Sequence, residues 1–96
     1  MSKLTKSYHE SLLQAIQDPQ EAAEYLTAAL EEGDSATFLL ALRHVAEAKG
    51  MSAVATTAHL NRESLYRMLS EQGNPQLASL TALLDALDLR LAVTVK

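Results

Sequence analysis

The sequence predicts an all-α domain. Leucine and alanine, both strong helix formers, provide 18 and 16 of the 96 residues. Glycine occurs three times and proline twice, so few residues would interrupt a helix. The chain has only one isoleucine and four valines, which argues against a β-sandwich or barrel, and its 48% hydrophobic content argues against disorder. From the length we expect one small domain.

The first third of the chain predicts two helices. Residues 1–7 lack a periodic pattern and are expected to fray, whereas Tyr8–Gln17 has apolar residues at helical spacing. The segment Asp18–Glu21 has the cap, proline and glutamate of a helix start with a capping box, and Gly33 predicts the end of that helix. Its predicted apolar stripe consists of Ala22, Tyr25, Leu26, Ala29 and Leu30.

Two more helices follow. Asp34 or Ser35 is predicted to cap a helix that ends at Gly50, and Ser52 to cap a short helix over residues 53–58. The inward residues predicted for the longer helix are Phe38, Leu39, Leu42, Val45 and Ala46.

A tight turn is expected at His59–Asn61, where Asn61 caps another short helix over residues 62–70. After a loop at residues 70–75, Pro75 is predicted to open the last helix. The inward residues predicted for these two helices are Leu65, Met68, Leu69, Leu77, Leu80, Leu83, Leu84 and Leu87.

The end of the chain changes period. Four apolar residues alternate with other residues over 89–96, a pattern typical of a half-buried β-strand. They are Leu89, Leu91, Val93 and Val95. Because no other segment predicts a strand, we expect two copies of the chain to pair through this one, antiparallel, in a homodimer.

Charge is distributed unevenly along the chain, whose net charge is −4. Residues 1–34 carry −5, while residues 35–96 carry +1. Between Lys49 and Met68, three basic residues stand against Glu63 alone. We therefore expect the two parts of the chain to contact different partners.

Two short helices joined by a tight turn and flanked by longer helices have the outline of a helix-turn-helix. The exposed first turn of the second short helix would be Asn61–Ser64, with Arg67 one turn later on the same outward face. Arginine side chains there can reach guanine edges or phosphates of DNA. The pattern alone leaves two interpretations open, DNA binding and an ordinary solvated helix.

The residues also show a family resemblance. Gly50–Ala55 followed by Leu60–Arg67 resembles the Cro/repressor-type (Xre) helix-turn-helix. More narrowly, the chain resembles the HigA-like addiction-module antidote proteins, a family of DNA-binding prophage proteins. The segments that carry this resemblance, within residues 18–93, are Asp18-Pro19, Ala22–Leu26, Ala28–Asp34, Phe38–Arg43 and Arg62–Arg67.

The resemblance implies a Cro/repressor-like bundle of five to six helices with a short C-terminal β-strand. It divides the chain into an N-terminal helical extension (1–34), a helix-turn-helix DNA-binding domain (35–88) and a strand that serves dimerisation (89–96). It implies the antitoxin of a type II toxin–antitoxin system that represses its own operon as a homodimer. The implied partners are operator DNA and a small basic toxin of the RelE/HigB type, which we expect the acidic first third to contact.

Residue roles follow from the same resemblance. Arg62, Glu63 and Arg67 match the groove-facing positions of the recognition helix, and Asn61 and Ser64 match its cap and first turn. The other matched helix starts, which approach phosphates in the family, contain Ser52 and Asn74. Glu63 either accepts a hydrogen bond from cytosine or orders a neighbouring arginine.

Two features depart from the family pattern. His59 stands where the turn usually has glycine, so we expect an altered turn, because positive φ angles favour glycine. Alanines replace polar residues over 53–58, which predicts fewer phosphate contacts. A protein-interaction module that uses the helix-turn-helix only as a scaffold is therefore the alternative function. The terminal strand has an alternative too, namely addition to the sheet of the toxin.

Several functions are not expected. The chain has no cysteine, so it forms no disulfide or thiolate metal site, and His9, His44 and His59 are too widely spaced for metal ligation. No nucleophile elbow or glycine loop is present, and we expect no enzymatic activity, cofactor or small-molecule substrate. Neither a membrane span nor the core of a signal peptide is apparent, so we expect a cytoplasmic protein.

Overall fold

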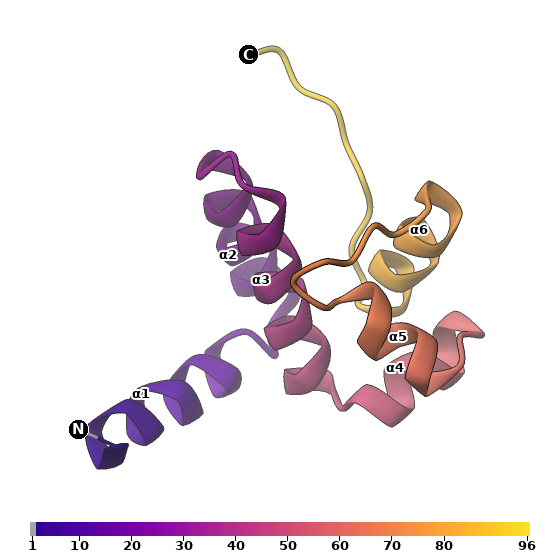
Figure 1. The fold of residues 1–96 in the computed structure, drawn as a ribbon. Helices are drawn as coiled ribbons and strands as arrows, with labels where there is room; N and C mark the ends of the chain where they lie inside the picture. Colours follow the sequence, from indigo (N-terminus) through magenta and orange to yellow (C-terminus); the bar gives the residue numbers. More distant parts are fainter. Residues whose placement is uncertain (1) are drawn as a thin grey trace.

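The computed structural model describes residues 2–96, with side chains described from Ser7 onward. It is all-helical, as predicted, and no strand forms within residues 2–96. The six helices shown in Figure 1 are α1 (Ser2–Ala15), α2 (Pro19–Glu31), α3 (Ser35–Lys49), α4 (Met51–Ala58), α5 (Arg62–Met68) and α6 (Leu77–Ala86). None of the helices in this range combines the length and hydropathy needed to cross a bilayer.

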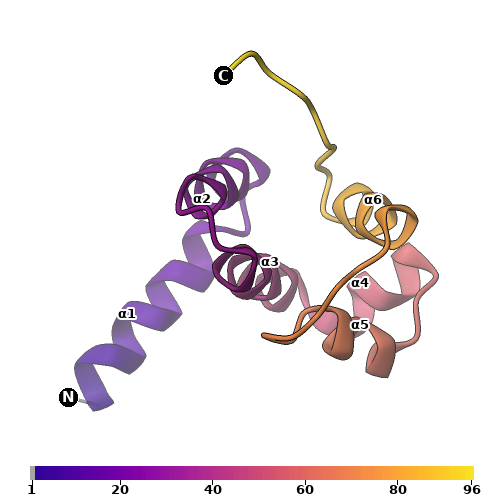
Figure 2. The same cartoon turned by 45° about the horizontal axis from the view of Figure 1, so that its top comes forward.

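Helix α3 lies at the centre of the arrangement. It packs against α1 and α2 on one side and against α4 on the other, and α4 in turn packs against α5 and α6. Figures 1 and 2 both show α1 and α2 on one side of α3, with α4, α5 and α6 on the opposite side. The two groups of helices therefore share α3 as their common support.

A single apolar core joins the two groups. Leu42 and Val45 of α3, Leu65 of α5 and Leu83 of α6 are fully buried within it. Each buried side chain of this size contributes on the order of 1.5–3 kcal/mol relative to an exposed one. From Ser7 onward, no polar or charged residue is buried, so the described polar side chains reach the surface.

Helix α1 differs from its prediction at its start. It begins at Ser2, whereas residues 1–7 were expected to fray; Met1 lies outside the described residues. Extending an existing helix by one residue needs only that residue to be ordered, and residues 2–7 contain neither glycine nor proline. Residues 2–7 can therefore be helical without apolar residues at helical spacing.

Helix α2 follows its local signals with two exceptions. Asp18 occupies the N-cap position, Pro19 opens the helix, and Gly33 follows its end with a φ angle of +79°, as predicted. The Asp18 side chain makes no capping hydrogen bond, however, so the predicted capping box is not formed. Leu30 was placed in the apolar stripe but is 59% exposed, because it lies on the edge of the helix that α3 does not cover.

The caps of α3 are those predicted. The Asp34 carboxylate accepts hydrogen bonds from the Ala36 backbone N–H at 3.3 Å and from the Thr37 hydroxyl at 2.9 Å. Gly50 ends the helix with a φ angle of +102° and also serves as the N-cap of α4. The predicted cap at Ser52 is therefore wrong, since α4 already begins at Met51.

The start of α6 was also predicted too early. The helix begins at Leu77 with Gln76 as its N-cap, two residues after Pro75. Leu77 is 68% exposed and does not face inward, whereas Leu83 and Leu84 are buried as predicted. The first turn of α6 projects beyond the helices that cover the rest of it, so its leucine has nothing to pack against.

The predicted C-terminal strand is not formed. Leu89 packs against the core, and its backbone N–H donates to the Leu84 carbonyl at 2.8 Å. The following residues leave the helices as an extended chain (Figure 1), and Val93 and Val95 are fully exposed. A strand needs a neighbouring strand for its backbone hydrogen bonds, and residues 2–96 supply none.

A contact among the side chains of His9, Tyr25 and His44, called here the His44 joint, connects the first three helices. The Tyr25 hydroxyl of α2 and His44 Nδ1 of α3 share a hydrogen bond of 2.7 Å, and the His9 ring of α1 meets the His44 ring edge-on at 5.4 Å between centroids. Burial lowers the pKa of His44, with His9 and Arg43 acting in the same direction and Glu47 opposing them. Burial also raises the pKa of Tyr25.

The His44 joint predicts a pH-dependent stability. Because its pKa is lowered on folding, His44 binds more protons in the unfolded chain, and the free energy of unfolding should fall as the pH drops below about 6.5. His44→Gln should reduce this slope in urea unfolding between pH 7.5 and 5.5. An unchanged slope would show that His44 does not carry the effect.

Candidate functional site

A three-residue turn sets the position of α5 relative to α4. His59 follows α4 with φ 58° and ψ 39°, in the left-handed region, so the unusual backbone of the turn falls on this residue, as expected. The Leu60 backbone N–H donates to the Ala55 carbonyl at 2.8 Å, which satisfies one of the last carbonyls of α4. The turn is therefore retained although it lacks glycine.

The start of α5 is fixed by its cap. The Asn61 side-chain oxygen accepts hydrogen bonds from the backbone N–H groups of Glu63 at 2.7 Å and Ser64 at 3.4 Å, as predicted for an N-cap. Leu65 and Leu69 are buried beneath the helix. Because the Asn61 cap and the buried leucines fix the position of α5, the face of the helix opposite these leucines is exposed in one defined orientation.

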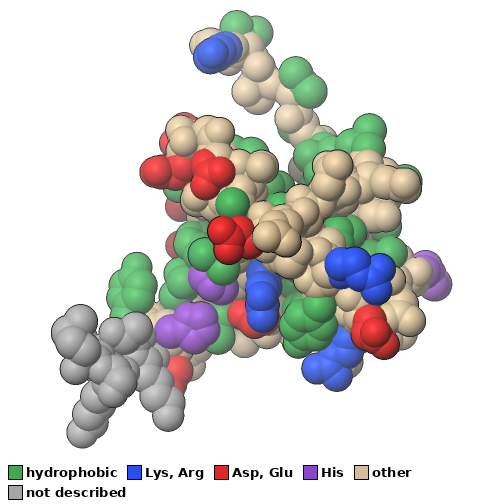
Figure 3. Space-filling model, viewed as in Figure 1, with side chains coloured by type: hydrophobic (Ala, Val, Ile, Leu, Met, Phe, Trp, Pro, Cys, Tyr) green, Lys and Arg blue, Asp and Glu red, His purple; other side chains and the backbone are tan. Residues whose placement is uncertain are grey.

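That exposed face carries charged side chains. Arg62, Glu63 and Arg67 are all exposed. The ion pairs among the side chains described join Arg43 to Glu47 and Lys49 to Asp88, so neither arginine of α5 is engaged in one. Figure 3 shows basic side chains gathered over α5 on this face, with a single acidic group between them.

Tyr66 supports this face from below. It is half-buried and packs against the core. The guanidinium carbons of Arg62 and Arg43 each lie 5.6 Å from the centre of its ring, within the range of cation–π attraction. The tyrosine therefore helps to hold Arg62 against the surface.

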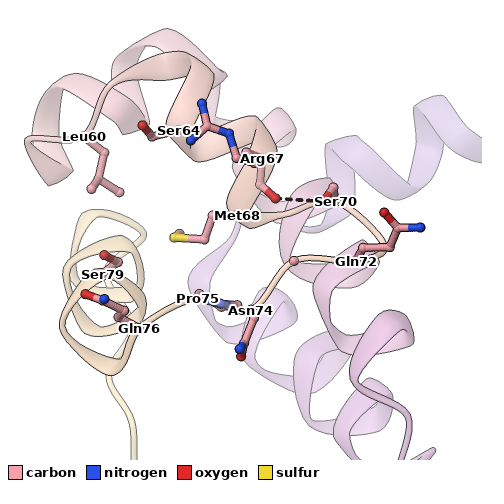
Figure 4. Close-up of a pocket in the computed structure, with 11 residues that line it drawn as sticks. Leu60, Ser64, Arg67, Met68, Ser70, Gln72, Asn74, Pro75, Gln76 and Ser79 are labelled. Carbon is pink, nitrogen blue, oxygen red and sulfur yellow. Dashed lines mark hydrogen bonds between the residues drawn. The ribbon is translucent and has the colours of Figure 1, made fainter.

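A hollow of about 450 Å³ adjoins α5. Figure 4 shows its lining, which comes from α5, from the loop before α6 and from α6 itself. Ser64, Arg67 and Asn74, predicted as site residues, all line it, although Asn74 belongs to the loop and not to the first turn of a helix. Of the other predicted residues, Asn61, Arg62 and Glu63 form the start of α5, while Ser52 lies exposed on α4 and does not line the hollow.

The hollow contains further polar residues that the sequence did not predict. Ser70, Gln72 and Gln76 belong to the loop before α6, and Ser79 lies on α6 itself. The loop folds back onto the end of α5, where the Gly73 backbone N–H donates to the Ser70 carbonyl at 2.9 Å. A Cβ atom at Gly73 would come within 2.2 Å of the Met68 carbonyl oxygen, so only glycine fits. This Gly73-Asn74-Pro75 run was the signal that could have indicated the loop's close approach.

The arrangement favours binding of a negatively charged, hydrogen-bonding surface. Two arginines that form no ion pair with the side chains described from Ser7 onward extend from a short, rigidly held helix, and the neighbouring hollow adds hydroxyl and amide groups. Guanidinium groups bind phosphates and guanine edges, and serine and asparagine bind phosphates through single hydrogen bonds.

Comparison with known proteins adds a family. A family model described as "Probable addiction module antidote protein" matches residues 6–95. A protein of Haemophilus influenzae described only as uncharacterized is 38% identical over 74 residues, which cover 77% of this chain and 76% of that protein. No solved structure matches the chain.

The backbone at His59 predicts an unusual response to glycine. His59→Gly should raise the free energy of unfolding by about 0.5–1 kcal/mol, because glycine adopts positive φ angles without a Cβ penalty. Ala53→Gly, on the exposed side of α4, should lower it by about 1 kcal/mol and serves as the control. Thermal and urea unfolding measure the free energy of unfolding of both variants. A His59→Gly protein that is less stable than wild type would show that the left-handed backbone at His59 carries no such cost.

Proposed function

Because the chain belongs to the probable addiction module antidote family, which supports an antitoxin role and implies a toxin partner, we propose that it is the antitoxin of a type II toxin–antitoxin system and the repressor of its own operon. The proposed toxin is of the RelE/HigB type. The chain would act in the cytoplasm as a homodimer bound to operator DNA, without catalytic activity of its own.

The observation that supports DNA binding is the exposed face of α5. Arg62 and Arg67 are exposed and outside any ion pair among the described side chains, and buried Leu65 and Leu69 orient the helix that carries them. A single short helix of this kind fits the major groove of B-DNA. We therefore assign α5 as the recognition helix and α4 with α5 as a helix-turn-helix.

The remaining residues would position α5 on the duplex. Ser64 and Asn74 share the hollow with Arg67 and would bind phosphates at one edge of the helix. Ser52 would approach the backbone from α4, and Asn61 would keep the first turn of α5 rigid through its cap. Glu63 lies exposed between the two arginines. It would accept a hydrogen bond from a cytosine amino group or hold one of the arginines in place.

The proposed homodimer uses the extended end of the chain. Leu91 is 47% exposed, and Val93 and Val95 are fully exposed, although all three are apolar. Antiparallel pairing of two such segments would satisfy their backbone groups and use the same surface twice. A dimer of this symmetry would present two α5 helices to a palindromic operator, with half-sites about 34 Å apart.

The DNA-binding role predicts that operator DNA is bound more weakly when either arginine of α5 is replaced. Arg62→Ala and Arg67→Ala should each weaken binding by about 1–3 kcal/mol, because each would remove a guanine or phosphate contact. Fluorescence anisotropy with the DNA upstream of the chain's own gene measures this. Lys3→Ala removes one positive charge near the start of α1 and should bind like wild type.

Two results would contradict this role. Wild-type affinity of both arginine variants would show that α5 is not the recognition helix. A wild-type protein that does not bind this DNA would favour the alternative function, a protein-interaction module with a helix-turn-helix scaffold, to which the net charge of −4 also points.

The homodimer predicts a dependence on the last eight residues. Truncation after Asp88 should give a monomer in light scattering and much weaker operator binding, whereas the full chain should be a dimer. Val93→Asp should act similarly, because it places a charge on the apolar face of the pairing segment. Thr94→Asp adds the same charge to the alternate face and should leave the dimer intact.

Other outcomes would relocate the interface. A truncated protein that remains a dimer would place it on the helices. A full-length chain that is monomeric, and that needs residues 89–96 only for toxin binding, would show that the segment adds to the toxin's sheet.

A further inference from the structure

An exposed leucine stands out on α3. Leu40 is 53% exposed, although its neighbours Leu39 and Leu42 are buried in the core. It forms a ridge between two hollows that both include Leu40 and Thr37 in their lining. One hollow lies between α3 and α2, and the other between α3 and the residues that follow α5.

The two hollows adjoin each other at Thr37 and Leu40, and together they form a mainly apolar groove along α3. Their volumes are about 360 and 280 Å³. We call this surface the Leu40 groove and define it by Tyr25, Ala28, Ala36, Thr37, Leu40 and Leu69. Apart from Thr37, these residues present mainly apolar surface, and the Thr37 hydroxyl is already bonded to Asp34. An apolar groove of this kind accepts apolar side chains of a partner.

The rim of the groove is acidic. Glu32 lines one hollow and Glu71 lines the other. Between Pro19 and Leu42 the chain has five acidic residues and no basic one. Figure 3 shows acidic side chains over the α2–α3 turn on the same face as the basic side chains of α5. Arg43 lines the same hollow as Glu71, and its charge is paired with Glu47 at 3.5 Å.

We infer that the Leu40 groove is the docking surface for the toxin, a basic protein that places apolar side chains on both sides of Leu40 and lysine or arginine side chains against Glu32 and Glu71. This inference rests on the antitoxin role proposed above. Acidic rims attract basic partners and exclude acidic ones. A second copy of the chain fits poorly, because a symmetric contact would bring its acidic residues against their equivalents.

The groove and the DNA-binding face use different side chains. The exposed arginines of α5 do not line either hollow of the groove, and none of the residues that define the groove lies on the exposed face of α5. Toxin binding and DNA binding should therefore be separable by mutation.

The experiment uses the full chain and the purified protein encoded by the reading frame next to its own gene. Leu40→Glu should raise the Kd for that protein about tenfold or more, because it places a charge at the apolar centre of the interface. Glu32→Lys combined with Glu71→Lys should raise it by about tenfold, mainly through slower association, with a smaller effect at high salt. Leu40→Ala should give a smaller loss with an unchanged melting temperature.

The matched controls change the same residue types elsewhere. Leu77→Glu alters another exposed leucine, on α6, and Glu10→Lys reverses an exposed charge of α1. Both should keep the wild-type Kd within about threefold. Leu40→Glu and Leu40→Ala should bind operator DNA like wild type, while Arg62→Ala and Arg67→Ala should keep their toxin affinity.

Each possible outcome decides between the proposals. Wild-type affinity of Leu40→Glu, or an equal loss in Leu77→Glu, would overturn the groove assignment but leave the antitoxin role standing. A wild-type chain that does not bind the neighbouring gene product would overturn the antitoxin role itself. A loss of the homodimer in Leu40→Glu would show that the groove binds a second copy, including its extended end, and would likewise overturn the assignment.

Discussion

The burial of α3 is the constraint on which the rest of the structure depends. Leu42, Val45 and Ala46 are fully buried in the core that both groups of helices share. Because α1 and α2 pack on one side and α4 on the other, loss of this helix would separate the two groups. The same burial fixes which residues of α3 remain outside, and so leaves Leu40 exposed along one edge of the helix.

A consequence of this central helix is the separation of charge. The acidic residues of α2 lie on one side of α3, and the arginines of α5 lie on the other (Figure 3). The net charge of −4 therefore describes neither surface. Exposed charges that lie more than about 8 Å apart are largely screened from one another in physiological salt, so separate surfaces can each attract their own partner. This arrangement gives a physical basis for the proposed contacts with a basic toxin and with DNA.

The orientation of α5 depends on several small contributions. The Asn61 cap typically stabilises a helix by about 1 kcal/mol, and the burial of Leu65 adds on the order of 2 kcal/mol. The left-handed conformation of His59 is unfavourable for a residue with a Cβ atom, so it offsets part of this stabilisation. Gly73 lets the following loop close against the end of the helix. The exposed arginines are thus carried by a helix held at its start, its inner face and its end.

The sequence by itself determined the helical class and the local signals of each helix. Asp34, Gly50 and Asn61 act through backbone groups within a few residues, so their roles could be read without the fold, and the inward position of Leu65 follows from helical periodicity. For the candidate site, periodicity also indicated the outward face that carries Arg62 and Arg67.

Only the tertiary structure decided which predicted faces are covered. Leu30 and Leu77 satisfy helical periodicity but are exposed, because no neighbouring helix reaches them. The hollow beside α5 joins residues from α5, α6 and the loop between them, and its depth depends on how closely that loop approaches α5. The alternation after Asp88 indicates strand propensity, yet a strand forms only where another chain segment supplies the hydrogen bonds. Local sequence specifies caps and periodicity, whereas exposure and pairing depend on what lies opposite.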